Sequence, residues 1–208
     1  MPTEDRIEAA VVETVEKLER VGYEVTETES GEDPRESDSS FISYVFASAP
    51  SANFYIVFTA EAHHADIVYP YTVAGALAEK LEDDEMSAVL DVLDLSIGKD
   101  RSDPEVVGAY LIENTDEERL QKPAFNIARY GISPLTAVQF EDSTAGFPLE
   151  FRVTGTLLPY EDDFSVRSLN TRVDATLSAG KRTRRYVESC LTVETSGDPS
   201  EYVVATRF

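Results

Sequence analysis

The chain has 208 residues, of which 42% are hydrophobic, and 40 acidic against 18 basic residues give it a formal net charge of −22. A chain of this length buries roughly 70% of its unfolded surface, and its single cysteine, Cys190, excludes an intrachain disulfide or a zinc cluster of several thiolates. No apolar run approaches the roughly 18 residues of a membrane span, and the charged start MPTEDRIEAA lacks the apolar block of a signal peptide. We therefore expect a cytoplasmic globular protein without a membrane partner.

The acidic residues are spread from Glu4 to Glu201, and only five of the 18 basic residues are lysines. Self-repulsion on this scale destabilises a compact chain unless salt screens it. A nucleic-acid mimic would gather its acids in one stripe, and direct nucleic-acid binding needs a positive field, so we expect no nucleic-acid partner. In its acid excess and lysine scarcity the composition resembles that of cytoplasmic proteins of salt-loving archaea, which implies a halophilic protein.

The N-terminal segment predicts one helix followed by a loop. Residues 4–21 carry apolar side chains at helical spacing, with Thr3 as the N-cap and Gly22 as the end of the helix. Residues 26–40 have almost no apolar side chain and are rich in acids, with Gly and Pro among them, which is typical of a mobile surface loop.

Three strands and two helices are predicted next. The strand segments are rich in Phe, Tyr, Ile and Val, and short connections favour an antiparallel meander of residues 41–49, 53–61 and 66–73. Pro70 in the third segment predicts a sheet edge or the end of pairing. Both faces of residues 53–61 are apolar, so this sheet needs cover on two sides, which a second copy of the chain would supply. Residues 73–97 change to helical spacing in two pieces around a turn at 82–84.

The polar segment 98–104 is the candidate boundary between two halves, 1–100 and 101–208. The second half predicts a strand, a helix that Thr115 caps and Pro123 interrupts or kinks, a strand pair, a helix that Gly180 caps, and two final strands. These elements cover residues 105–114, 115–131, 135–142 with 149–160, 165–179, and 184–194 with 200–208.

Both halves show helices and antiparallel strands in a similar order. We therefore expect an α+β fold in which helices cover antiparallel sheets, either as two similar halves or as one continuous domain. In this element order the chain resembles the type III secretion chaperones and the bacterial YbjN family. The closest local likeness is GTLLPYEDDFSVRSLNTRVDATL, residues 155–177, where a strand runs through a turn into an amphipathic helix. The resemblance implies a noncatalytic dimer that binds a protein partner, and it transfers no catalytic residue.

The segment EAHHAD holds both histidines of the chain and two acids, a potential metal-ligand set of Glu61, His63, His64 and Asp66. Consecutive strand residues point to opposite faces, so the two imidazoles meet one ion only if the loop bends them together. Zinc takes three or four protein ligands, and the chain has no third histidine. The segment is therefore either a polar hairpin turn or the centre of a small metal-dependent enzyme.

The one cluster of basic residues lies in SAGKRTRRY and consists of Lys181, Arg182, Arg184 and Arg185. A phosphate-binding loop is excluded, because residues 174–179 contain no glycine and an arginine replaces the required Ser or Thr after the lysine. The cluster could pair with nearby acids such as Glu188. Its arginines are also suited to bidentate contact with an acidic partner, a second subunit or a phosphate group.

No other pattern predicts catalysis. The acid pairs at 83–84 and 162–163 are expected by chance in a chain with 40 acids, and Cys190 within a predicted strand is typical of a small core residue. We predict no cofactor and no catalytic residue. The sequence favours a noncatalytic, halophilic, homodimeric adaptor, chaperone-like factor or regulator with a protein partner. The alternatives are a metal-dependent enzyme centred on His63 and His64, and a regulator that binds an anionic ligand near Arg184 and Arg185.

Overall fold

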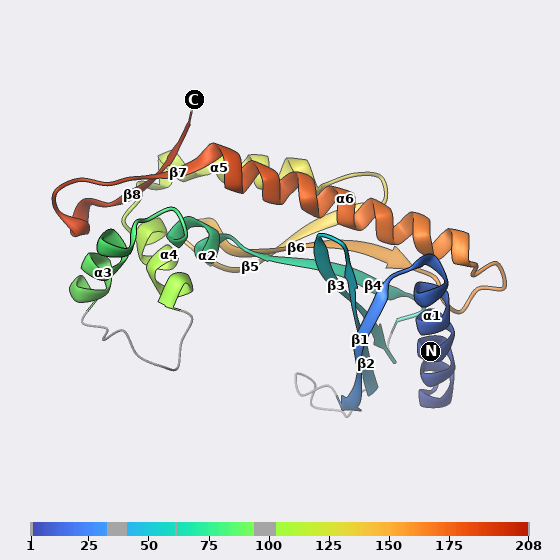
Figure 1. The fold of residues 1–208 in the computed structure, drawn as a ribbon. Helices are drawn as coiled ribbons and strands as arrows, with labels where there is room; N and C mark the ends of the chain where they lie inside the picture. Colours follow the sequence, from blue (N-terminus) through green and yellow to red (C-terminus); the bar gives the residue numbers. More distant parts are fainter. Residues whose placement is uncertain (1, 33–40, 61, 94–102, 208) are drawn as a thin grey trace. The chain divides into compact units, whose positions relative to one another are not determined.

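Figure 1 shows the computed structural model, which describes residues 2–32, 41–60, 62–93 and 103–207. Over these residues the fold is α+β, as predicted, with an antiparallel sheet in the order β1-β2-β3-β4-β6-β5 and a separate pair β7-β8. None of the described helices is both long and apolar enough to cross a bilayer. The elements are α1 (Glu4–Val21), β1 (Glu24–Glu32), β2 (Phe41–Ala49), β3 (Ala52–Thr59), β4 (Ala65–Thr72), α2 (Val73–Ala78), α3 (Asp83–Val92), α4 (Asp103–Glu113), α5 (Glu117–Gly131), β5 (Thr136–Thr144), β6 (Phe147–Leu157), α6 (Val166–Cys190), β7 (Leu191–Glu194), the 3-10 helix η1 (Pro199–Glu201) and β8 (Val203–Thr206).

The chain forms two compact units, each built from three stretches of sequence. Unit 1 consists of Met1–Pro70, Ile132–Ala137 and Val153–Gly180, and unit 2 consists of Tyr71–Gly131, Val138–Arg152 and Lys181–Phe208. Most of the predicted linker 98–104 lies outside the described residues. The division into halves 1–100 and 101–208 stays a prediction.

Unit 1 contains the predicted first helix and meander. Helix α1 packs on β1, β2 and β3, and it ends at Gly22, whose φ of 89° is the left-handed conformation that glycine adopts most easily. Strands β2, β3 and β4 pair antiparallel in sequence order. The pairing of β3 with β4 ends at Val68, so Pro70 lies beyond the end of that pairing, as one of its two predicted roles requires. It is not at a sheet edge, because β6 is the other neighbour of β4.

Strand β1 corrects the predicted loop over residues 26–40. Glu24–Glu32 pairs antiparallel with β2, with a bulge between Val25 and Glu27, and almost every side chain of the strand is exposed. An edge strand with both faces in water can consist of polar residues, because backbone hydrogen bonds to its neighbour hold it in place. Side-chain hydrophobicity therefore carried no signal for it. Residues 33–40 lie outside the described part of the chain.

Helix α4 corrects the predicted strand over residues 105–114. Val107, Leu111 and Ile112 are buried, and their spacing of four and one puts them on one side of a helix. Gly108 lies against the backbone of Ala74 in α2, where an added Cβ would be 1.9 Å from the Ala74 carbonyl oxygen. This close helix pairing, which needs glycine, overrides the strand preference of the Val–Val pair.

Helix α5 begins at Glu117, so Thr115 is not its N-cap. The buried Thr115 hydroxyl donates to the Leu111 carbonyl oxygen and accepts from the Val204 amide, both at 2.7 Å, and so joins the end of α4 to β8. The helix is continuous through the buried Pro123, so the predicted interruption is absent from residues 117–131, and the alternative of a kink stays a prediction.

Helix α6 extends eleven residues past its predicted end at residue 179 and replaces most of the strand predicted over 184–194. Gly180 is an interior residue of α6. An added Cβ there would lie 2.3 Å from a ring carbon of the buried Tyr69, so the glycine permits close packing. A glycine that permits close packing was thus mistaken for a C-cap. Cys190 is the last residue of the helix and is half-buried, so it is not a strand residue of the core. Strands β7 and β8 form the predicted final hairpin over shorter ranges.

Candidate functional site

A hollow of about 310 Å³ lies in unit 2 beside the C-terminal parts of α5 and α6. Most of its exposed surface is carbon. Four of the lining residues, Arg182, Arg185, Tyr186 and Ser189, follow one another at spacings of three, one and three. In a helix this spacing places their side chains on one side. The lining consists of Tyr130 from α5 and of Arg182, Arg185, Tyr186, Ser189 and Cys190 from α6.

The helix divides the predicted basic cluster between two sides. Arg184 faces away from the hollow lining, with its Nε 2.6 Å from Glu188 Oε1 and its guanidinium carbon 5.6 Å from the centre of the Tyr71 ring. This confirms the predicted pairing with Glu188 for one member of the cluster. Lys181 precedes Arg184 by three residues, on the same side of the helix. Arg182 and Arg185 are the two members that the structure brings to the hollow.

Arg182 and Arg185 are exposed. Among the residues that the structure describes, neither guanidinium forms an ion pair or a hydrogen bond. The surroundings are also poor in acids: residues 117–131 and 181–190 together hold seven of the chain's 18 basic residues but only three of its 40 acidic ones. This region therefore has a positive charge, opposite in sign to that of the whole chain.

Two tyrosines form the aromatic part of the lining. Tyr186 is 7% exposed, and its hydroxyl accepts a hydrogen bond of 3.2 Å from Asn126 Nδ2, which orients the ring. The Tyr130 ring packs on it with centroids 5.3 Å apart and remains 41% exposed. Burial raises the pKa of Tyr186, so this phenol stays neutral at physiological pH and adds no negative charge beside the arginines.

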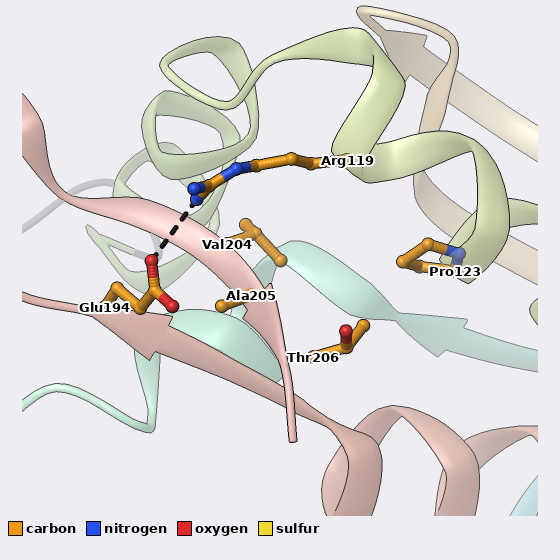
Figure 2. Close-up of a pocket in the computed structure, with 6 residues that line it drawn as sticks. All are labelled: Arg119, Pro123, Glu194, Val204, Ala205 and Thr206. Carbon is orange, nitrogen blue, oxygen red and sulfur yellow. Dashed lines mark hydrogen bonds and ion pairs between the residues drawn. The ribbon is translucent and has the colours of Figure 1, made fainter. Parts of the chain in front are cut away.

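A second hollow, of about 200 Å³, is lined by Arg119 and Pro123 of α5. These two residues lie on the same face of α5 as Asn126 and Tyr130, because the four follow at spacings of four, three and four. Figure 2 shows Arg119 reaching from α5 toward Glu194 of β7, and their charged atoms are 3.2 Å apart. Residues 204–206 of β8 complete the lining. Arg119 and Glu194 neutralise each other, so neither of these two charges is available to a ligand in this hollow.

The predicted metal set lies in unit 1 and is only partly described. His64 Nε2 is 3.7 Å from Asp66 Oδ1, and His63 is exposed. Burial raises the pKa of Asp66, while the charge of a protonated His64 acts in the opposite direction. Within the described ranges, no three His, Cys, Asp or Glu side chains are close enough to hold an ion together. Glu61 lies outside these ranges, so the four-residue site stays a prediction.

One predicted acid pair has a structural role at the start of α3. Asp83 and Asp84 occupy its first turn, where the partial positive charge of the helix N-terminus favours carboxylates. The carboxylate of Glu85 accepts a hydrogen bond from the Glu82 amide at 2.9 Å. Asp162 and Asp163 of the second pair are exposed.

Sequence reasoning found the two arginines of the hollow and missed its tyrosines. Tyr186 and Ser189 share the stripe of Arg182 and Arg185 only when the helix is continued beyond Gly180. Tyr130 lies on a different helix, more than fifty residues earlier in the chain, and only packing brings it to the same hollow.

No family model matches the chain, and no curated protein matches it. The chain is similar to the crystal structure of an uncharacterized protein from Methanothermobacter thermautotrophicus, with a TM-score of 0.47 and 12% identity, over 86% of this chain and 96% of that one.

Proposed function

We propose that the protein is a noncatalytic binding protein that holds an anionic small molecule in the hollow between α5 and α6. The observation that carries this proposal is the position of Arg182 and Arg185 beside that hollow, with no partner for either guanidinium in the part of the chain that the structure describes. Its volume of about 310 Å³ lies at the lower end of the range found for small-molecule sites.

The spacing of the two arginines suits one shared anion. Residues three apart on a helix have Cβ atoms roughly 5–6 Å from each other, and the long side chains of Arg182 and Arg185 can converge on one phosphate or carboxylate. Each guanidinium can form two parallel hydrogen bonds to such a group, which makes these contacts stronger and more directional than those of a lysine.

Arg182 and Arg185 differ from two other arginines of α5 and α6, because within the described ranges Arg184 pairs with Glu188 and Arg119 with Glu194. Acids outnumber basic residues in the chain by more than two to one. A role in balancing surface charge would favour acids next to Arg182 and Arg185, whereas this stretch is poor in acids. An external anion is the partner that fits this arrangement.

The experiment is a thermal-unfolding titration with inorganic phosphate, compared with sodium chloride at equal ionic strength. Binding to the folded state at about 100 times Kd stabilises it by about 2.7 kcal/mol. We expect a rise in Tm with phosphate that is lost in the double variant Arg182→Gln/Arg185→Gln. The matched control Arg184→Gln removes one charge from the other side of α6 and should keep the response. Equal responses from wild type and the double variant would contradict the proposal.

A protein-binding adaptor, halophilic and dimeric, is the second candidate, and an aromatic face in unit 1 favours it. Tyr44, Phe46 and Tyr55 of the neighbouring strands β2 and β3 are half-buried and pack together, with ring centroids 5.8–6.2 Å apart. Aromatic side chains of this kind are enriched in protein interfaces. Sedimentation in molar salt tests the dimer, and a monomer at all concentrations would count against it.

A further inference from the structure

We infer that the ligand of the α5–α6 hollow carries an aromatic ring next to its anionic group, as in an aryl phosphate or an aryl carboxylate. This inference rests on the proposed function, because it assumes that the hollow binds an anion. It adds the class of the ligand, which charge alone does not define.

The lining of the hollow contains apolar surface in addition to two positive charges. A bare anion would use the guanidiniums of Arg182 and Arg185 and leave the mostly carbon surface of the hollow in contact with water. Tyr130, Tyr186 and Cys190 belong to the same lining as the two arginines. A ligand with a ring can cover it while its anionic group contacts the guanidiniums, so both parts of the lining find a partner.

The geometry of the tyrosines decides where such a ring would lie. The two tyrosine rings are 5.3 Å apart and tilted by 33°, so they pack on each other and leave no gap for a third ring between them. Tyr186 is held by Asn126 and almost fully buried, whereas Tyr130 is 41% exposed. The ring of the ligand would therefore pack on Tyr130, and Tyr186 would hold the Tyr130 ring in place by packing against it. A stacked or edge-on aromatic contact strengthens binding by about 2- to 12-fold.

The test compares two phosphate monoesters that differ only in the ring, phenyl phosphate and methyl phosphate. At about pH 8 both are dianions, because the second pKa of such groups is about 6. Isothermal titration calorimetry at constant ionic strength gives both dissociation constants. We expect phenyl phosphate to bind about 2- to 12-fold more tightly than methyl phosphate.

Variants separate the ring contact from the charge contact. Tyr130→Leu should reduce the affinity for phenyl phosphate to that for methyl phosphate without changing the latter, and Tyr130→Phe should keep the preference. Arg182→Gln/Arg185→Gln should weaken binding of both compounds, and Arg184→Gln should weaken neither. Circular dichroism confirms that each variant folds, and the exposure of Tyr130 makes its replacement mild.

Cys190 provides an independent readout, because it lines the hollow and is the one cysteine of the chain. Its alkylation by the neutral reagent iodoacetamide should slow when phenyl phosphate is bound, and slow less in Tyr130→Leu at the same concentration. Unchanged alkylation at saturating phenyl phosphate would place the ligand elsewhere and overturn the inference.

The outcomes distinguish the two proposals. If both esters bind equally and both need Arg182 and Arg185, the ring inference fails and the anion site stands. If neither ester binds, or if binding survives the loss of both arginines, the proposed function fails, and the ring inference fails with it.

Discussion

Replacement of Gly108 by alanine tests the helix pair α2–α4, which the structure contains and the sequence did not predict. In an isolated helix this change stabilises by about 1 kcal/mol, because alanine has the higher helix propensity. Here the new Cβ would lie 1.9 Å from the Ala74 carbonyl oxygen and 2.3 Å from its carbonyl carbon. Both are backbone atoms, so no side-chain rotation relieves the overlap.

The size of the effect follows from the distance. Carbon and carbonyl oxygen approach to about 3.3 Å in close backbone contacts, so α2 and α4 would have to separate by about 1.4 Å. A gap of that size removes much of the dispersion attraction between the two helices, whose buried side chains include Leu77, Ala78, Val107 and Leu111. Overpacking of a core costs about 1–3 kcal/mol and sometimes more. A contact between two backbones belongs at the upper end of that range, so we expect a net loss of about 2 kcal/mol.

The assay is chemical and thermal unfolding of the wild type, Gly108→Ala and a matched control, Gly75→Ala. Gly75 lies in α2, and an added Cβ would meet its nearest neighbour, Thr72 Cγ2, at an ordinary 3.5 Å. The control should be unchanged or more stable by up to about 1 kcal/mol, whereas Gly108→Ala should lower Tm by about 4–8 °C. A Gly108→Ala variant as stable as the control would refute the close approach of α2 and α4.

Three further predictions concern single polar contacts. Thr115→Val should cost about 1–3 kcal/mol in unfolding experiments, because it leaves the buried Val204 amide without its acceptor, and Thr115→Ser should recover most of the loss. A double-mutant cycle of Arg119→Ala and Glu194→Ala should give a coupling below about 1 kcal/mol that molar salt removes, since both side chains are more than half exposed; a larger coupling that resists salt would contradict this. Burial and the hydrogen bond to Asp174 raise the pKa of Tyr23 above its ordinary value of 10.0, so its contribution to stability is complete below pH 10.0 and is lost as pH rises further. As the pH rises above 10.0, the melting temperature of Tyr23→Phe should therefore fall less than that of the wild type. Identical alkaline melting profiles would count against this role of the phenol.

The elements that were predicted correctly are those whose signal is local. The face of Ile7, Val11 and Leu18 together with Gly22 defines α1, and the aromatic and β-branched residues of β2, β3 and β4 define the meander. Periodic burial of this kind repeats within one element, so it can be read without knowing the partner.

The elements that were missed depend on contacts with another element. Strand β1 exists through backbone bonds to the next strand, β2. Gly108 in α4 and Gly180 in α6 lie directly against Ala74 and Tyr69, which are distant in the chain. A glycine looks the same in the sequence whether it ends a helix or lets another group approach it.

By itself the sequence determined the charge balance, the α+β class, the single thiol and the cluster that contains Arg182 and Arg185. Only the tertiary structure decided which arginines pair and which remain available, because that depends on the direction of each side chain around α6. It also brought Tyr130 to the same hollow from a separate helix. Charge is a property of each residue and adds along the chain, whereas a binding site is a set of directions and distances that exists only after packing.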